Sequence, residues 1–240
     1  MNTNSKKCLC AAILGIAIIM GEILSARAEP KALYTMDFGQ KENIDASKWL
    51  KKQGFDEFLD AKRLHLKFEN EGLRISTNEG LTAMFGLKFG KPDYVPDVNH
   101  IVIEWGVNRF PIGADWAQGK KRVPIGVIFS FGEKKLSSGL PFGIKNAHYF
   151  LSAFIGEKEQ VNRMYLGALY QEGGRYFCVS NGAPMGQTIV TKFEVNNRFK
   201  DVFKQEKTPP ITGFAFEMNT DDTKGGAAAF IKKIVFYSEH

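Results

Sequence analysis

The chain alternates hydrophobic and polar residues in short stretches, which are separated by Gly, Pro, Asn and Asp. In residues 101–107 (IVIEWGV), for example, Ile101, Ile103, Trp105 and Val107 fall on one face. Alternation of period two between turn residues predicts β-strands. The pattern predicts further strands at residues 64–68, 72–77, 84–89, 123–131, 147–155, 164–170, 175–180, 211–218 and 229–237.

Helical spacing is found in only two places. Residues 45–54 (DASKWLKKQG) begin with a capping residue, Asp45 or Ser47, and end at Gly54. Residues 193–207 place Val195, Phe199, Val202 and Phe203 at helical intervals. About ten strands with one or two short helices predict an all-β fold, an antiparallel two-sheet β-sandwich of jelly-roll type.

The first 28 residues have the pattern of a secretory signal peptide. Lys6 and Lys7 precede a short apolar run, and an Ala-Arg-Ala site ends at Ala28. The run is shorter than the ~20 residues that a spanning helix needs, and Glu22 interrupts it. We therefore expect a leader at residues 1–28, one β-sandwich domain at residues 29–240, and a periplasmic or secreted protein that meets the membrane only during export.

Charge and cysteine content restrict the partners. The formal net charge of +6 is spread over the chain, with lysines in pairs and no basic stripe, so we expect no nucleic-acid partner. Beyond the leader only Cys178 remains, which excludes an intrachain disulfide. Its position in a predicted strand favours a buried thiol.

The segment EMNTDDTKGGAAAF at residues 217–230 joins the last two predicted strands. Asp221 and Asp222, with Asp37 from an earlier segment, are candidate ligands for a calcium ion bridging two parts of a sandwich. The spacing does not match an EF-hand loop, because Phe230 stands where the bidentate Glu belongs. We prefer a polar turn that lets the two strands pair as a hairpin, and we expect no cofactor, with calcium as the alternative.

Two carboxylates are candidate catalytic residues. Glu104 and Glu217 lie on the polar faces of their predicted strands. If both pointed into one sheet, they would serve as acid and base on a glycosidic bond, at separations of roughly 5.5 Å for retention or 6.5–9.5 Å for inversion. Two solvent-facing glutamates are the simpler interpretation, since alternation alone places polar residues there.

Trp116 and His148 are candidate ligand-binding residues. Trp116 lies in a polar loop (PIGADWAQGKKR), where its ring would stack on the apolar face of a sugar. His148 and Tyr149 are the base and acid types that a polysaccharide lyase requires, although neighbours on a strand point to opposite faces. The histidines show no metal-ligand spacing, and no nucleophile elbow, phosphate loop or dinucleotide motif is present.

Three stretches resemble the bacterial secreted family of domain of unknown function 3047: IVIEWGV, RVPIGVIFSFG, and residues 195–236 with their turn NTDDT. The resemblance covers about residues 60–238 and implies a jelly roll like that of carbohydrate-binding modules, without an established activity. Asn219 replaces the usual first Asp of the family turn, and Lys232-Lys233 replaces a common Gly-Asp pair. Both departures remove acidic oxygens and weaken the calcium alternative.

Together these features predict a secreted or periplasmic, non-catalytic binding domain whose partner is a glycan or a cell-envelope protein. One alternative is a glycan-cleaving enzyme, a glycoside hydrolase or polysaccharide lyase, that uses carboxylates on a concave sheet. A further alternative is a subunit of an envelope protein complex.

Overall fold

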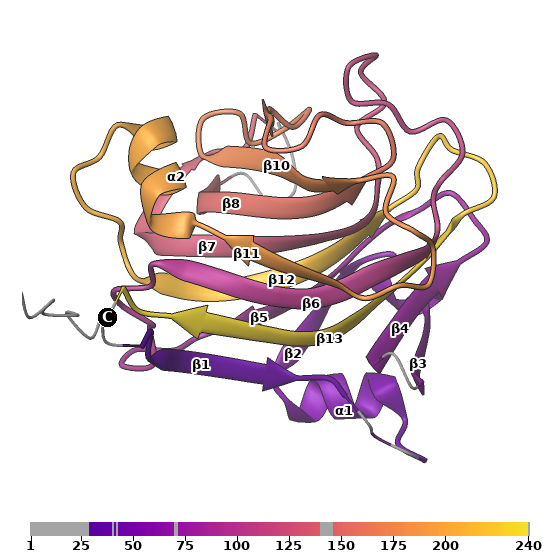
Figure 1. The fold of residues 1–240 in the computed structure, drawn as a ribbon, viewed down its shortest axis with the longest axis horizontal. Coiled ribbons are helices and arrows are strands. Elements are labelled where there is room, and N and C mark those ends of the chain that lie inside the picture. The colour runs from indigo at the N-terminus through magenta and orange to yellow at the C-terminus, as the bar shows by residue number, and fades with distance from the viewer. Residues whose placement is uncertain (1–28, 40, 42, 70–71, 140–145, 240) are drawn as a thin grey trace, which may run out of the picture.

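A computed structural model describes residues 29–39, 41, 43–69, 72–139 and 146–239. The predicted leader lies outside the described residues. Within them the chain forms two stacked sheets, a β-sandwich of the jelly-roll type (Figure 1). No described helix is long and apolar enough to cross a membrane.

The six-stranded sheet has the strand order β11-β6-β13-β4-β3. Strand β1 also pairs with β13, on the same side of β13 as β4. It lies in front in Figure 1. Its strands are β1 (Ala32–Asp37), β3 (His65–Glu69), β4 (Gly72–Thr77), β6 (His100–Arg109), β11 (Ile189–Phe193) and β13 (Ala227–Tyr237).

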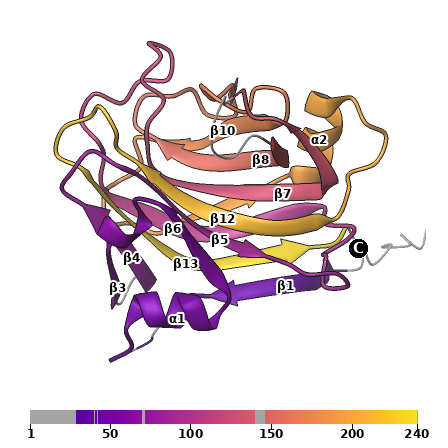
Figure 2. The same cartoon turned by 180° about the vertical axis from the view of Figure 1, so that it is seen from behind.

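The seven-stranded sheet has the order β2-β5-β12-β7-β8-β10-β9 and faces the viewer in Figure 2. Its strands are β2 (Phe55–Leu59), β5 (Thr82–Lys88), β7 (Val123–Ser137), β8 (Asn146–Gly156), β9 (Met164–Tyr165), β10 (Gly174–Asn181) and β12 (Ile211–Asn219). All its pairs are antiparallel except β8 with β10, which run parallel. The long connection between these two strands brings the chain back in the same direction.

The inner faces of the two sheets form one aromatic core. Trp105 is fully buried, as the alternation predicts, and its indole N–H donates to Oγ1 of Thr191 (3.0 Å). Phe214 of one sheet meets Phe236 of the other at a ring-centroid distance of 6.0 Å. Burying such rings is the main source of stability in a sandwich of this size.

Both predicted helices are present. Helix α1 (Ala46–Lys52) is capped by Asp45, whose carboxylate accepts from the backbone N–H of Lys48 (2.9 Å). Helix α2 (Val195–Phe203) buries Val195 and Phe199 against the end of the sandwich. Its Phe203 ring lies 4.6 Å from that of Tyr149.

The hairpin predicted at residues 217–230 is wrong. Strand β12 pairs with β5 and β7, whereas β13 pairs with β1, β4 and β6, so the segment crosses from one sheet to the other. Both strands have a large apolar face, and these faces bury each other across the core instead of lying in one sheet. The buried Thr220 fixes the crossover, since its hydroxyl donates to the carbonyl of Glu79 (2.7 Å) and accepts from Leu81 N–H (3.1 Å).

Other strands differ from the pattern in extent. The strand predicted at residues 164–170 shrinks to the two residues of β9, because the following residues bend away. Gly167 in this bend lies so near the Tyr176 ring that an added Cβ would be 2.9 Å from it. Strands β1, β2 and β11 fall outside the predicted set. They are short edge strands whose alternation is interrupted by charged or polar residues.

Candidate functional site

Glu104 and Glu217 lie on different sheets. Glu104 is on β6, where it pairs with Lys233 and Val190, and it points away from the core. Glu217 is on β12, opposite Met84 of β5 and Gly126 of β7, and it points outward from the seven-stranded sheet. Because the core separates the two outer faces, these carboxylates cannot act together on one bond, and the predicted acid–base pair is not formed.

Glu217 nevertheless has the most unusual environment of the described carboxylates. Its side chain leans over Gly126: a Cβ at that glycine would lie 3.2 Å from Oε1 of Glu217 and 3.5 Å from Oγ of Ser152. Ser152 is completely buried, and its hydroxyl has no hydrogen-bond partner among the described residues. Because Gly126 has no side chain, the carboxyl of Glu217 has space to approach the hydroxyl of Ser152.

Burial changes the ionisation of this site. Glu217 is half-buried, and desolvation raises the pKa of its carboxyl to about 7. The neighbouring Tyr176 has its pKa raised well above 10, first by burial and then by the charge of Glu217. A carboxyl with this pKa exchanges its proton near neutral pH, and such groups are concentrated at functional sites.

The residues around Glu217 form a row across the outer face. Met84 and Phe58 continue the row toward the β2 edge, and the Phe58 ring packs over Gly86, 3.1 Å from the position of a Cβ there. In the adjacent row, Ser152 pairs with Tyr176, and Tyr176 with Tyr165. A polar group set among aromatic and apolar side chains is the usual composition of a small-molecule site.

Trp116 is buried, not exposed as expected for a sugar platform. Its ring stacks on Phe154 at 4.9 Å, and its indole N–H donates to the carbonyl of Arg122 (3.1 Å). Its backbone N–H donates to the buried Glu159 (3.2 Å). The polar residues around Trp116 in the sequence suggested an exposed loop. Instead, the loop folds back onto the outer face of the sheet, where Trp116 forms a small second core with Cys178.

His148 lies at the other end of the same outer face. It is opposite Lys135 on β7, while Tyr149 points inward to Phe199 and Phe203. The predicted opposite orientation of His148 and Tyr149 is thus confirmed, and the two do not share a site. Burial and the charges of Lys135 and Lys88 lower the pKa of His148.

The calcium candidates are separated and already engaged. Asp37 accepts from the backbone N–H of Gly39 (2.7 Å). Asp221 and Asp222 face Arg122, at 3.6 and 2.9 Å. Across the described residues, no three His, Cys, Asp or Glu side chains gather as a metal site would require. The guanidinium of Arg122 thus balances the charge of these two carboxylates.

Cys178 is fully buried beneath Trp116, and its thiol donates to the carbonyl of Ser180 (3.1 Å). Burial raises its pKa to about 11, so little thiolate is present at neutral pH. We expect an aromatic disulfide reagent to label the folded protein at least ~100-fold more slowly than the protein in denaturant. Rapid labelling of the folded protein, followed by absorbance, would contradict this placement.

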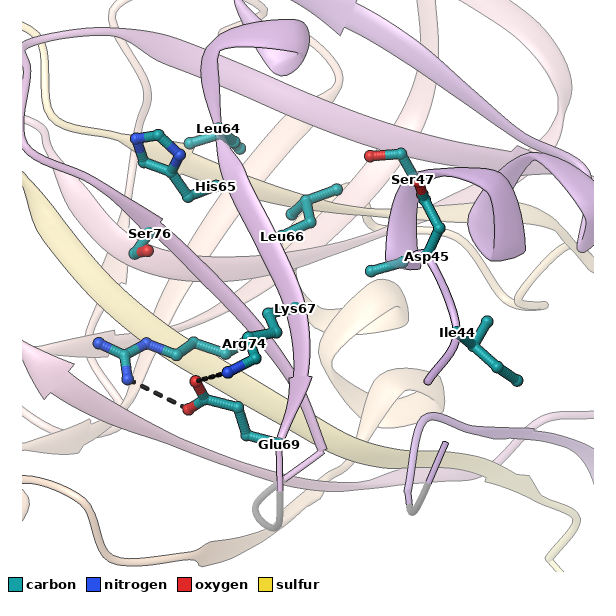
Figure 3. A pocket seen from close by; sticks show the side chains of 11 residues that line it. Ile44, Asp45, Ser47, Leu64, His65, Leu66, Lys67, Glu69, Arg74 and Ser76 are labelled. Carbon is teal, nitrogen blue, oxygen red and sulfur yellow. Dashed lines mark hydrogen bonds and ion pairs between the residues drawn. The ribbon is translucent and has the colours of Figure 1, made fainter. Parts of the chain in front are cut away.

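A cavity of about 760 Å³ lies between the start of α1 and strands β3 and β4 (Figure 3). Lys67 and Arg74 both reach Glu69 there, at 3.6 and 3.1 Å. His65 and Ser76 line the same space. None of the site residues predicted from sequence faces this cavity, and its two longest cations are already paired.

Sequence reasoning identified Glu217 but missed the residues that surround it. Gly126, Ser152 and Tyr176 come from three other strands, and only the strand register places them together. A serine within the apolar run AHYFLSAFI was the one available signal, because a polar residue in a buried strand needs a reason.

Comparisons with known proteins give only distant likenesses. No family model and no curated protein matches the chain. Among solved structures, endoglucanase Cel12A from Rhodothermus marinus is 7% identical, covering 72% of this chain and 86% of that chain, with a TM-score of 0.37. The xylan-binding module CBM15 is 10% identical (86% and 97% covered, TM-score 0.32). The exoplasmic/lumenal domain of VIP36, in its Ca²⁺/Man3GlcNAc-bound form, is 10% identical (88% and 90%, TM-score 0.38).

Proposed function

We propose that the protein is a secreted or periplasmic, non-catalytic glycan-binding domain of the predicted family, and that its ligand contacts the outer face of the seven-stranded sheet at Glu217. One observation carries the proposal: this half-buried carboxylate has neither an ion pair nor a hydrogen bond to any described residue. Leaving a carboxylate desolvated and unpaired costs stability, so a retained one calls for a ligand.

The surroundings of Glu217 suit a sugar. A sugar ring has an apolar face that packs on aromatic or aliphatic side chains and hydroxyls that donate to a carboxylate. Phe58 and Met84 lie on one side of Glu217, and Tyr176 lies on the other. Trp116 contributes indirectly, because its stacking on Phe154 holds the second core that supports Tyr176.

Binding to a polysaccharide panel tests this function. We expect retention of the wild type and a loss of about tenfold or more in affinity for Glu217→Ala, since hydrogen bonds to a charged group contribute ~1.5–3 kcal/mol. Glu104→Ala is the matched control and should bind normally, because Glu104 lies on the other sheet. Failure of the wild type to bind any glycan, or normal binding by Glu217→Ala, would refute the proposal.

A second candidate function is acid–base catalysis by Glu217 alone. The pKa of about 7 favours it, because such a carboxyl both takes and releases protons at neutral pH. Chromatography of the retained glycan after long incubation separates the two functions. An intact glycan supports binding only, whereas shortened chains that are absent with Glu217→Gln would establish catalysis.

A further inference from the structure

A cluster of positive charge lies on the same outer face as Glu217, toward one end of the sheet. Lys88 of β5 and Lys135 of β7 are exposed, on the two strands that flank β12, and His148 of β8 is opposite Lys135. Burial lowers the pKa of His148, and the charges of Lys135 and Lys88 lower it further. The strand register places the three side chains near one another: Lys88 is opposite Gly213, Gly213 is opposite Ser130, and Ser130 is opposite Phe150, two residues from His148.

Glu133, the acid whose charge acts on His148, does not cancel this positive charge. Glu133 forms an ion pair with Lys91 and accepts a hydrogen bond from the Tyr94 hydroxyl (3.4 Å). The charge of Glu133 raises the pKa of His148, but burial and the two lysines outweigh it. Net positive charge remains for a ligand.

Glu217 and this cluster are aligned along the strands. Lys88 is opposite Gly213 on β12, and Glu217 is four residues further along β12. An even number of residues keeps both side chains on one face, and at ~3.3 Å per residue the two positions are separated by roughly 13 Å. A ligand of several sugar units lying along the strands would reach both.

We propose that Lys88 and Lys135 bind an oxyanion, a uronate carboxylate or a sulfate ester, on a glycan whose uncharged sugar lies against Glu217. This inference rests on the proposed function. The two ends of the face differ in their preference for an anion. Burial alone perturbs the carboxyl of Glu217, and no cation lies among its described neighbours. Its charged form therefore repels an anion. At the other end, the same anion is attracted by Lys88 and Lys135 and reduces the repulsion between their positive charges.

The test compares one oligosaccharide backbone in neutral, uronate-containing and sulfated forms, with sodium sulfate alone as a further probe. Calorimetry at low ionic strength should show the anionic forms binding about tenfold more tightly than the neutral form, with the difference lost at high salt. The Lys88→Ala/Lys135→Ala variant should bind all forms equally. The matched control, Lys62→Ala/Lys67→Ala, should retain the preference.

His148 provides a readout that does not depend on affinity. Because the lysines lower its pKa, a bound oxyanion should raise the pKa measured by NMR titration, and the neutral oligosaccharide should not. Equal affinity for all forms in the wild type would overturn this inference while leaving the proposed function intact. If the wild type prefers anionic forms and Glu217→Ala does not change the affinity, the lysine site is supported and the role of Glu217 is refuted. Absence of all binding would refute both.

Discussion

Replacing Gly226 with alanine should lower the free energy of unfolding by about 3 kcal/mol or more. Gly226 has a φ of +60°, and an added Cβ would lie 2.1 Å from the carbonyl oxygen of Thr77. The obstacle is backbone of the neighbouring strand and cannot rotate away. Denaturant unfolding, followed by tryptophan fluorescence, measures the loss.

Gly225→Ala is the matched control for this substitution. Gly225 also has a positive φ of +77°, but its added Cβ would meet only the flexible side chain of Ile112 at 3.4 Å. We therefore expect a loss of only about 1–2 kcal/mol, from the left-handed conformation. Equal losses in the two variants would mean that the crossover does not approach Thr77 so closely.

The stability of the protein should fall as the pH rises from about 4.5 to 7, because of Glu217. Its pKa is near 4.5 in the unfolded chain and about 7 in the folded protein, so the folded state binds more protons within this range. Unfolding free energy decreases with pH wherever the folded state holds the extra proton. With ~1.4 kcal/mol per pKa unit and a reduction for partial exposure, the loss is on the order of 2 kcal/mol.

Glu217→Gln separates this effect from all other titrations. The variant should match the wild type near pH 4, where Glu217 is largely protonated in both the folded and the unfolded state, and exceed it by about 2 kcal/mol at pH 8, where the wild type carries a desolvated charge. Glu104→Gln should leave the wild-type pH dependence in place. A variant less stable than the wild type at pH 8 would show that the ionised carboxylate is stabilised by the fold, contrary to its unpaired environment.

The same substitution connects stability with binding. If the charge of Glu217 is retained for a ligand, Glu217→Gln should gain stability at pH 8 and lose glycan affinity under the same conditions. Natural proteins commonly give up stability at functional sites in this way. A gain in stability without a loss of affinity would indicate that the unpaired charge has no role in binding.

Local sequence determined much of the sandwich. The alternation around Trp105 indicates a strand with one buried face, and Asp45 with Gly54 delimits a helix that is present as α1. Both signals act between residues that are close in sequence, so no knowledge of distant contacts is needed. The lone Cys178 was likewise expected to be buried, and it is.

Strand pairing was decided only by the tertiary structure. The polar segment after Glu217 suits a hairpin, yet the strands on its two sides bury their faces against each other from different sheets. The loop composition is the same for a tight turn and for a crossover, because Asn, Asp, Thr and Gly satisfy their own backbone in both. The choice depends on which partners bury the most apolar surface, a property of the whole chain.

The candidate site shows the same division. The sequence by itself determined that Glu217 lies on the polar side of a strand and that the chain carries positive charge in scattered pairs. Only the tertiary structure placed Ser152, Gly126 and Tyr176 around that carboxylate, separated it from Glu104, and covered Trp116. The physical reason is that desolvation and electrostatic interactions depend on distances between strands far apart in the sequence, and these distances are fixed by the register of the sheets.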